Sequence, residues 1–199
     1  MRRIFSAGTW VLILAFILYG CAGPGKPVIG QQRIVERSAK EAPEWISWPF
    51  VEQEGVMYFS GAVKGVADYA VGLRQAKKEA EKNVYESIET KARVEFVENT
   101  RGSNMSQEDL GKFVQDGIAT ITENIKAQGI LPSEMYWEKV EETTEYGVKY
   151  FYNCYQLIQL SVEDYKKARR RAIEDLAKKA REENNKAAEE QAMKLLEKL

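Results

Sequence analysis

An apolar run from Trp10 to Tyr19 is the longest hydrophobic stretch of the chain. A helix that spans a bilayer core needs about 20 apolar residues, whereas roughly 7–15 are enough for the core of a secretory signal peptide. Arg2 and Arg3 supply the positive charge that precedes such a core. The pattern therefore predicts a signal peptide over residues 1–20, and no later apolar run approaches the length of a membrane span.

The rest of the chain alternates between strand and helix patterns. Strand formers fill three segments, which are residues 55–64, 134–142 and 148–161. A first helix is predicted from Asp68, whose carboxylate can cap it, to about Ala92, because apolar residues recur at three- and four-residue steps. A second helix is predicted between Ser106 and Gly129. Because a third helix follows the last strand, the expected order is β-α-α-β-β-α.

The last helix is expected to be long. Ser161 and Asp164 form a start signal, and nothing breaks the helical pattern from Val162 nearly to Leu199. Beyond Lys179 the apolar stripe thins to alanines before three closing leucines. We therefore expect residues 181–199 to extend beyond the domain core as a helix that is either solvated or available to a partner.

Glycines, prolines and scattered charges fill residues 21–42, which reads as a flexible tether. The folded α+β domain is expected over residues 43–180. At its start, Trp45, Trp48 and Phe50 are too apolar for a free linker, so we expect them to cap one end of the core. The alternative is that these rings form a platform on which a ligand stacks.

Charge and composition exclude several classes of function. Loss of Arg2 and Arg3 with the signal leaves 27 basic and 30 acidic residues, a net charge of −3, which argues against nucleic acid as a partner. The chain has no histidine, so a Ser-His-Asp site, a Cys-His site and a histidine-based zinc site are excluded. No motif with catalytic spacing is present, and we expect no enzyme activity and no metal site.

Two further features have a structural and a functional interpretation. Cys154 lies in an apolar strand pattern and is expected to be a buried inert thiol, with an intermolecular disulfide as the alternative. Three tyrosines share that strand and are expected to pack in a core or interface, with a stacking surface as the alternative. They are Tyr150, Tyr152 and Tyr155.

A basic cluster lies on the predicted last helix. Its members are Lys166, Lys167, Arg169, Arg170 and Arg171, and acidic residues flank it on both sides. A solvated, salt-bridged helix face is the simpler interpretation. Together with Trp45 and Trp48, the cluster is also our candidate surface for an anionic lipid, a glycan or a partner protein.

The signal peptide ends on Leu18-Tyr19-Gly20-Cys21, which resembles the lipobox of bacterial lipoproteins. The resemblance implies cleavage between Gly20 and Cys21 and a covalent lipid on the Cys21 sulfur, although Tyr19 is larger than the residue usual at its position. An uncleaved signal anchor is the alternative. Ala22, rather than aspartate, follows the cysteine, which favours the outer membrane over the inner. No cofactor other than this lipid is expected.

Further along the chain, the order of several features carries a second resemblance. Pro43 and Trp45 precede a strand that ends near Gly61, an alanine-spaced helix follows, and a strand with Trp137 leads to a tyrosine-rich strand and a final helix. Over residues 40–175 this resembles the family of small envelope lipoproteins named after the twenty-kilodalton lipoprotein of Helicobacter. The resemblance implies helices packed on a three-stranded antiparallel sheet. It also implies non-enzymatic roles at the outer membrane, in some members within assemblies around the flagellar motor.

The sequence therefore favours a non-enzymatic lipoprotein of the bacterial envelope with a structural or protein-interaction role. We expect it to bind the membrane through its lipid, and to bind other envelope proteins or copies of itself. Self-association is expected through an open edge of the strand at 55–64 and through the last helix. A glycan- or lipid-binding module of the envelope is the alternative.

Overall fold

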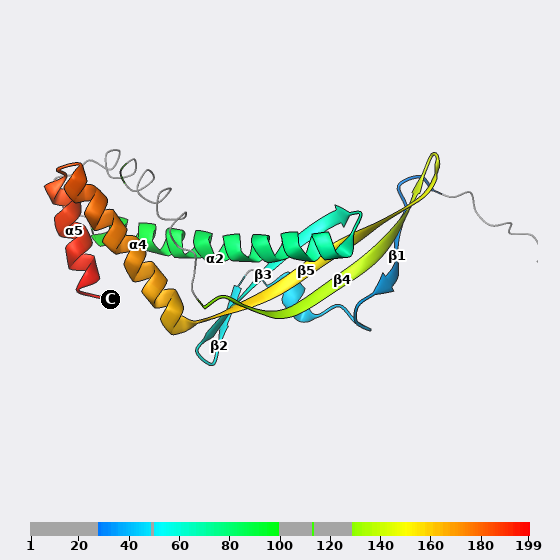
Figure 1. Cartoon of the computed structure of the whole chain (residues 1–199), viewed down its shortest axis with the longest axis horizontal. Coiled ribbons are helices and arrows are strands. Elements are labelled where there is room, and N and C mark those ends of the chain that lie inside the picture. Colours follow the sequence, from blue (N-terminus) through cyan, green and yellow to red (C-terminus); the bar gives the residue numbers. More distant parts are fainter. Residues whose placement is uncertain (1–27, 49, 100–112, 114–128) are drawn as a thin grey trace, which may run out of the picture.

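The computed structural model describes residues 28–48, 50–99, 113 and 129–199. Its elements form an elongated molecule in which one long helix lies along a narrow sheet (Figure 1). In chain order they are β1 (Gln32–Arg37), the 3-10 helix η1 (Glu44–Ser47), β2 (Phe50–Gln53), β3 (Val56–Val66), α2 (Tyr69–Asn99), β4 (Leu131–Thr144), β5 (Gly147–Ser161), α4 (Val162–Glu182) and α5 (Lys186–Leu196).

The sheet has five antiparallel strands in the order β1-β4-β5-β3-β2. The expected three-stranded sheet is therefore wrong, and so is the order β-α-α-β-β-α, because the described elements follow β-β-β-α-β-β-α-α. The two strands that the sequence pattern missed are at the edges. All six residues of β1 are exposed, and β2 is only four residues long, so neither shows the alternation of a half-buried strand.

Strand β1 lies inside the segment that we expected to be a tether. Its backbone pairs with the second half of β4, and its charges meet charges on that strand. Arg33 lies 2.6 Å from Glu141, and Arg37 lies 3.9 Å from Glu138. Only residues 21–27 of the expected tether 21–42 precede the part of the chain described by the structure.

Helix α2 covers one face of the sheet. The predicted cap is confirmed, since Asp68 Oδ1 accepts a hydrogen bond from the Val71 amide at 2.8 Å. The buried stripe has four-residue spacing and consists of Gly72, Ala76, Ala80, Val84, Ile88, Ala92 and Phe96. Small residues let the helix approach the sheet closely. At Gly61 of β3, an added Cβ would collide with the backbone of Ala76 and Ala80.

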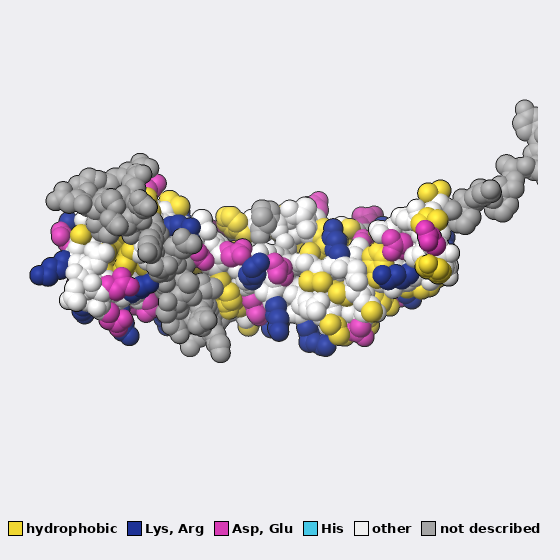
Figure 2. Space-filling view, turned by 90° about the horizontal axis from the view of Figure 1, so that it is seen from above, with side chains coloured by type: hydrophobic (Ala, Val, Ile, Leu, Met, Phe, Trp, Pro, Cys, Tyr) yellow, Lys and Arg dark blue, Asp and Glu magenta, His cyan; other side chains and the backbone are white. Residues whose placement is uncertain are grey.

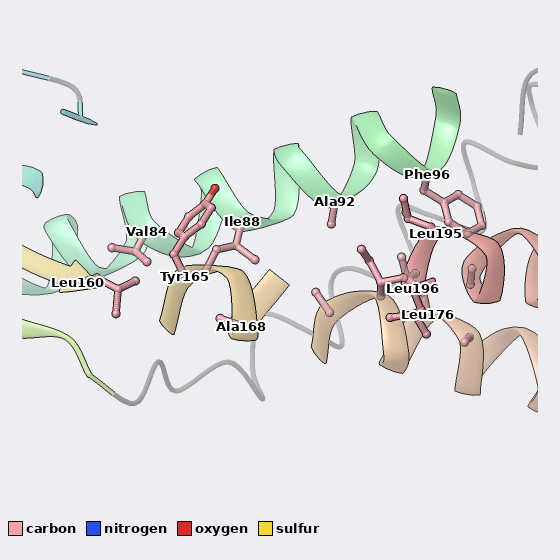
Figure 3. Packing of buried hydrophobic residues seen from close by; sticks show 14 of the residues in the cluster. Val84, Ile88, Ala92, Phe96, Leu160, Tyr165, Ala168, Leu176, Leu195 and Leu196 are labelled. Atoms are coloured by element: carbon pink, nitrogen blue, oxygen red, sulfur yellow. The ribbon is translucent and has the colours of Figure 1, made fainter. Parts of the chain in front are cut away.

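The C-terminal helix differs from the prediction. Its predicted start is confirmed, because Ser161 Oγ accepts a hydrogen bond from the Asp164 amide at 3.0 Å. The single extended helix is wrong: α4 ends at Glu182, Asn184 has a positive φ of 54°, and Asn185 caps α5. Helix α5 then folds back, and its leucines pack beside α4 and α2 (Figure 3). Burial of these leucines provides the reason for the break.

A smaller cluster lies on the sheet around η1. Trp45 is buried there with Tyr136, Tyr155 and Leu157, and its indole nitrogen donates a hydrogen bond to Glu134 Oε2 at 2.8 Å. Trp48 is partly buried against the same cluster. The prediction that Trp45 packs in a core is therefore confirmed, although its cluster is separate from the main core, and Trp45 is not a free stacking platform. The same prediction for Phe50 is wrong, because Phe50 on β2 is half exposed.

The predicted helix between Ser106 and Gly129 falls almost wholly outside the described residues. Phe113 is described, and its buried ring lies 6.2 Å from that of Phe96. Among the helices of the described part, none is both long and apolar enough to cross a bilayer.

A candidate binding groove between α2, α4 and the β2–β3 hairpin

The structure separates the residues that we had grouped as one candidate surface. Trp45 and Trp48 belong to the cluster around η1, whereas the basic residues lie on α4, whose buried side packs in the main core with α2. Gly20 and Cys21, the predicted cleavage and lipidation positions, lie outside the described residues.

The basic cluster itself is divided between different surroundings. Lys167 lies 2.8 Å from Glu163, and Arg170 lies 3.1 Å from Glu174, so these two belong to the salt-bridged helix face that we predicted. The hydrogen bond to Glu163 raises the pKa of Lys167. Arg171 is exposed, and Lys166 and Arg169 line the largest cavity described below.

That cavity is a groove of about 890 Å³ between α2, the start of α4 and the β2–β3 hairpin. Most of the surface inside it is apolar. Its apolar walls are contributed by Phe50, Met57, Phe59, Val94, Val162 and Tyr165. Lys91, Lys166 and Arg169 add positive charge to the lining, and Glu52 and Glu86 add negative charge. We call this feature the helix groove.

Hydrogen bonds fix the walls of the helix groove. The Tyr165 hydroxyl, which lies between α4 and α2 (Figure 3), is 2.9 Å from Ser87 Oγ. Burial raises the pKa of Tyr165, so its hydroxyl remains protonated at neutral pH. Asn83 donates to the Ser60 carbonyl at 2.8 Å and thereby ties α2 to β3. The walls are therefore held in place by contacts between elements far apart in the sequence.

An ion pair closes one side of this region. Arg169 Nη1 lies 3.3 Å from Glu95 Oε1, and both side chains are largely buried. Two other atoms of the pair, Arg169 Nε and Glu95 Oε2, are buried without a hydrogen-bond partner among the described residues. Removing one charge would leave the other buried and unpaired, so this pair fixes the spacing of α2 and α4 at the groove.

A second, smaller groove results from the fold-back of α5. It has a volume of about 410 Å³, and its lining includes Arg170, Glu174, Lys178 and Arg181 beside Met193 and Leu196. Since Arg170 already pairs with Glu174, and Arg181 with Glu189, much of its charge is compensated internally. The helix groove is larger and more apolar.

The most strongly shifted titratable groups lie outside the helix groove. Burial raises the pKa of Cys154 to about 11, and burial together with the carboxylate of Glu138 raises the pKa of Tyr136 to about 12. Both groups are therefore protonated at neutral pH. The Cys154 thiol donates weakly to the Tyr69 carbonyl and is fully buried, which confirms the buried thiol. No group of residues suited to bind a metal ion occurs within the described ranges.

The predicted tyrosines have three different environments. Tyr155 is buried beside Tyr136 in the η1 cluster, as expected of a core residue. Tyr152 contacts the rings of Tyr69 and Trp137. Tyr150 is exposed, and its hydroxyl donates to Glu141 at 2.9 Å. They therefore do not form one stacking surface.

Sequence reasoning missed the apolar residues of the helix groove. Phe50 and Val94 are half-exposed, and Val94 lies off the buried stripe of α2. A large apolar residue outside the stripe is the available signal, but single exposed apolar residues are common. Only the fold brings Phe50 and Val94 to the same cavity.

Comparisons with known proteins give no match: no family model, curated protein or solved structure is similar to this chain. The resemblance to the family of small envelope lipoproteins therefore stays a prediction from the sequence. The arguments for function come from the N-terminal motif and from the helix groove.

Proposed function

We propose that this protein is a non-enzymatic lipoprotein of the bacterial envelope that is anchored in the outer membrane and holds a partner protein in its helix groove. The anchor is the lipid expected on Cys21, at the end of the signal-like segment. The helix groove is the observation that carries the interaction role, because it is a large concave surface whose lining is mostly apolar. Membership of the small envelope-lipoprotein family is part of the same proposal.

The shape and chemistry of the helix groove suit an apolar segment of a protein. Its volume of about 890 Å³ lies in the range of about 300–1,000 Å³ that is usual for small-molecule pockets, so it would accept side chains of a partner rather than a whole helix. An amphipathic helix can place apolar side chains at positions i, i+3 and i+4 into such a groove. Charges of both signs in the lining, such as Lys166 and Glu86, would fix the orientation of the bound segment.

The test uses a photoreactive amino acid at Thr90, an exposed residue that lines the helix groove. We expect ultraviolet light to produce a cross-linked protein adduct in intact cells. Val94→Asp should abolish the adduct, since it places a charge on an apolar wall. Val71→Asp is the matched control, because Val71 is also exposed on α2 but does not line the groove. An adduct that survives Val94→Asp, or no adduct at all, would contradict the proposal.

A lipid is the second candidate occupant, and the three basic residues of the lining favour it. An acyl chain would lie on the apolar walls while the phosphate group met Lys91, Lys166 or Arg169. Native mass spectrometry separates the candidates, because a bound phospholipid adds a defined mass to protein purified without added lipid. We then expect Val94→Asp to remove that mass and Val71→Asp to retain it. Trp45 does not belong to this candidate lipid site, contrary to the prediction from the sequence, because Trp45 is buried.

A further inference from the structure

Two turns meet at the end of the molecule opposite to α4 and α5. One is the β4–β5 turn at Glu145 and Tyr146, and the other is the turn from Val28 to Gln31, closed by a backbone hydrogen bond and by Gly30 with φ 82°. Two further backbone hydrogen bonds join the second turn to Thr143 of β4. Val28, the first residue that the structure describes, belongs to the second turn. We call these two turns, with the adjoining Val148, the tip.

Four apolar or aromatic side chains of the tip are exposed to solvent. Tyr146 is 97% exposed, Val28 65%, Ile29 62% and Val148 54%. Hydrophobic side chains, with acidic ones between them, are visible at this end of the molecule in Figure 2. Residues at the apex of a turn are usually small or polar. An almost fully exposed tyrosine beside three exposed aliphatic residues is therefore a feature that requires an explanation.

The short segment between Cys21 and the tip indicates that the membrane is the surface that the tip contacts. Only residues 22–27 separate Val28 from the expected lipidated Cys21. Fully extended, these seven steps reach about 25 Å, at about 3.5 Å each, and a flexible chain of that length averages about 15 Å. A tether over the whole of residues 21–42 would have held the domain away from the membrane. Because β1 (Gln32–Arg37) is part of the sheet, the segment between the lipid and the fold is much shorter than expected. A lipid on Cys21 would therefore hold the tip at the membrane surface.

We propose that the tip is a second membrane contact, in which Tyr146, Val148, Val28 and Ile29 enter the headgroup region of the bilayer that holds the lipid anchor. Tyrosine suits this position because its ring is apolar and its hydroxyl is polar. Glu145 and Lys149 are exposed and charged, so their side chains would stay at the headgroup level. The proposal rests on the lipid anchor of the proposed function.

A membrane contact at the tip would give the molecule a defined orientation relative to the bilayer. The β4–β5 hairpin and α2 run along the long axis from the tip toward α4 and α5 (Figure 1). With 31 residues, α2 alone is about 46 Å long at 1.5 Å per residue. Two contacts at one end, the lipid and the tip, would make the molecule project from the membrane. The helix groove, formed by the second half of α2 and the start of α4, would face away from the lipid and toward a partner.

The test measures depth with nitroxide labels on the full lipidated protein in vesicles of phosphatidylethanolamine and phosphatidylglycerol. One label replaces Glu145, which leaves Tyr146 intact, and the control label replaces Lys186 in α5. Cys154 is buried and stays unlabelled. We expect the label at 145 to be poorly accessible to a water-soluble nickel chelate and readily accessible to oxygen, which concentrates in lipid. The label at 186 should be readily accessible to the nickel chelate and less accessible to oxygen. Tyr146→Ser should restore access of nickel at 145, whereas Val35→Ser in β1 should not.

The other possible results contradict either the lipid anchor or the tip contact. Protein that does not float with the vesicles overturns the lipid anchor, and the tip contact falls with it. Protein that floats while the label at 145 is as open to nickel as the label at 186 overturns the tip contact alone and leaves the anchor intact. Spin–spin broadening between labels at 145 would show that a second copy covers the tip, which also overturns the membrane contact.

Discussion

At the scale of single residues, Gly61 shows how closely α2 lies on the sheet. A Cβ at this position would overlap the carbonyl oxygen of Ala76 and the amide of Ala80, which are backbone atoms and cannot rotate away. We expect Gly61→Ala to lower the free energy of unfolding by about 2 kcal/mol or more, in the range of overpacked cores. Urea denaturation measures this. Lys64→Ala, at an exposed position of the same strand, is the control and should have little effect.

Cys154 gives a second prediction at this scale. Burial, with a smaller contribution from the negative charge of Asp68, raises the pKa of its thiol to about 11. The reactive thiolate is therefore scarce at pH 8. We expect iodoacetamide to leave Cys154 unmodified in the folded protein at this pH, and to modify it completely in denaturant, where burial is lost. Mass spectrometry of peptides gives the extent of modification.

Rapid native modification of Cys154 would show that the strand around it opens. The intermolecular disulfide that the sequence left open requires the same exposure. Non-reducing electrophoresis of the folded protein should therefore show no dimer that depends on Cys154.

At the scale of elements, the fold-back of α5 is the largest departure from the sequence pattern. Leu195 is buried in the main core beside Phe96 (Figure 3). Leu199, four residues later, is exposed. We expect Leu195→Ala to lower the free energy of unfolding by about 2–4 kcal/mol, as for other buried leucines, and Leu199→Ala to have little effect. Thermal or urea unfolding of both variants provides the comparison.

An extended helix over residues 162–199 would give a different result, because Leu195 would then be solvated like Leu199. Equal and small effects of the two substitutions would therefore contradict the helical hairpin. The break itself depends on Asn184, whose positive φ suits asparagine better than a β-branched residue.

At the scale of the whole molecule, the lipid that we propose on Cys21 would decide where the protein acts. We expect Cys21→Ala to abolish labelling with radioactive palmitate and to leave the signal uncleaved, because the Cys21 sulfur is the acceptor that we propose for the lipid. Electrophoresis of labelled cells gives both readouts. Cys154→Ala is the matched control and should retain the label. Label on the Cys21→Ala variant would mean that the lipobox interpretation is wrong.

Self-association stays a prediction, but its structural basis has changed. Strand β3, which we expected to offer an open edge, lies between β5 and β2. The last helix, which we expected to await a partner, packs on its own domain as α5. The remaining edges are β1, which is charged, and β2, which is four residues long. Both are poor templates for another chain, so a contact between copies would have to use another surface.

The sequence by itself determined the features that depend on neighbours along the chain. Asp68 and Ser161 cap helices through amides three residues away, and these caps were predicted correctly. The four-residue stripe of α2 and the strand formers of β3, β4 and β5 likewise predicted their elements. Helix caps and hydrophobic periodicity can be predicted from the sequence because the groups involved are separated by only a few residues along the chain.

Only the tertiary structure decided the rest. Strand β1 forms because its backbone finds β4, and the Arg33–Glu141 contact that accompanies it spans 108 positions of the chain. Helix α5 turns back because Phe96 and Leu176 provide apolar surface for its leucines, although the local pattern of that segment would also fit a straight helix. The helix groove and the tip join segments that lie far apart in the chain. Such contacts depend on where other elements lie, and no local pattern carries that information.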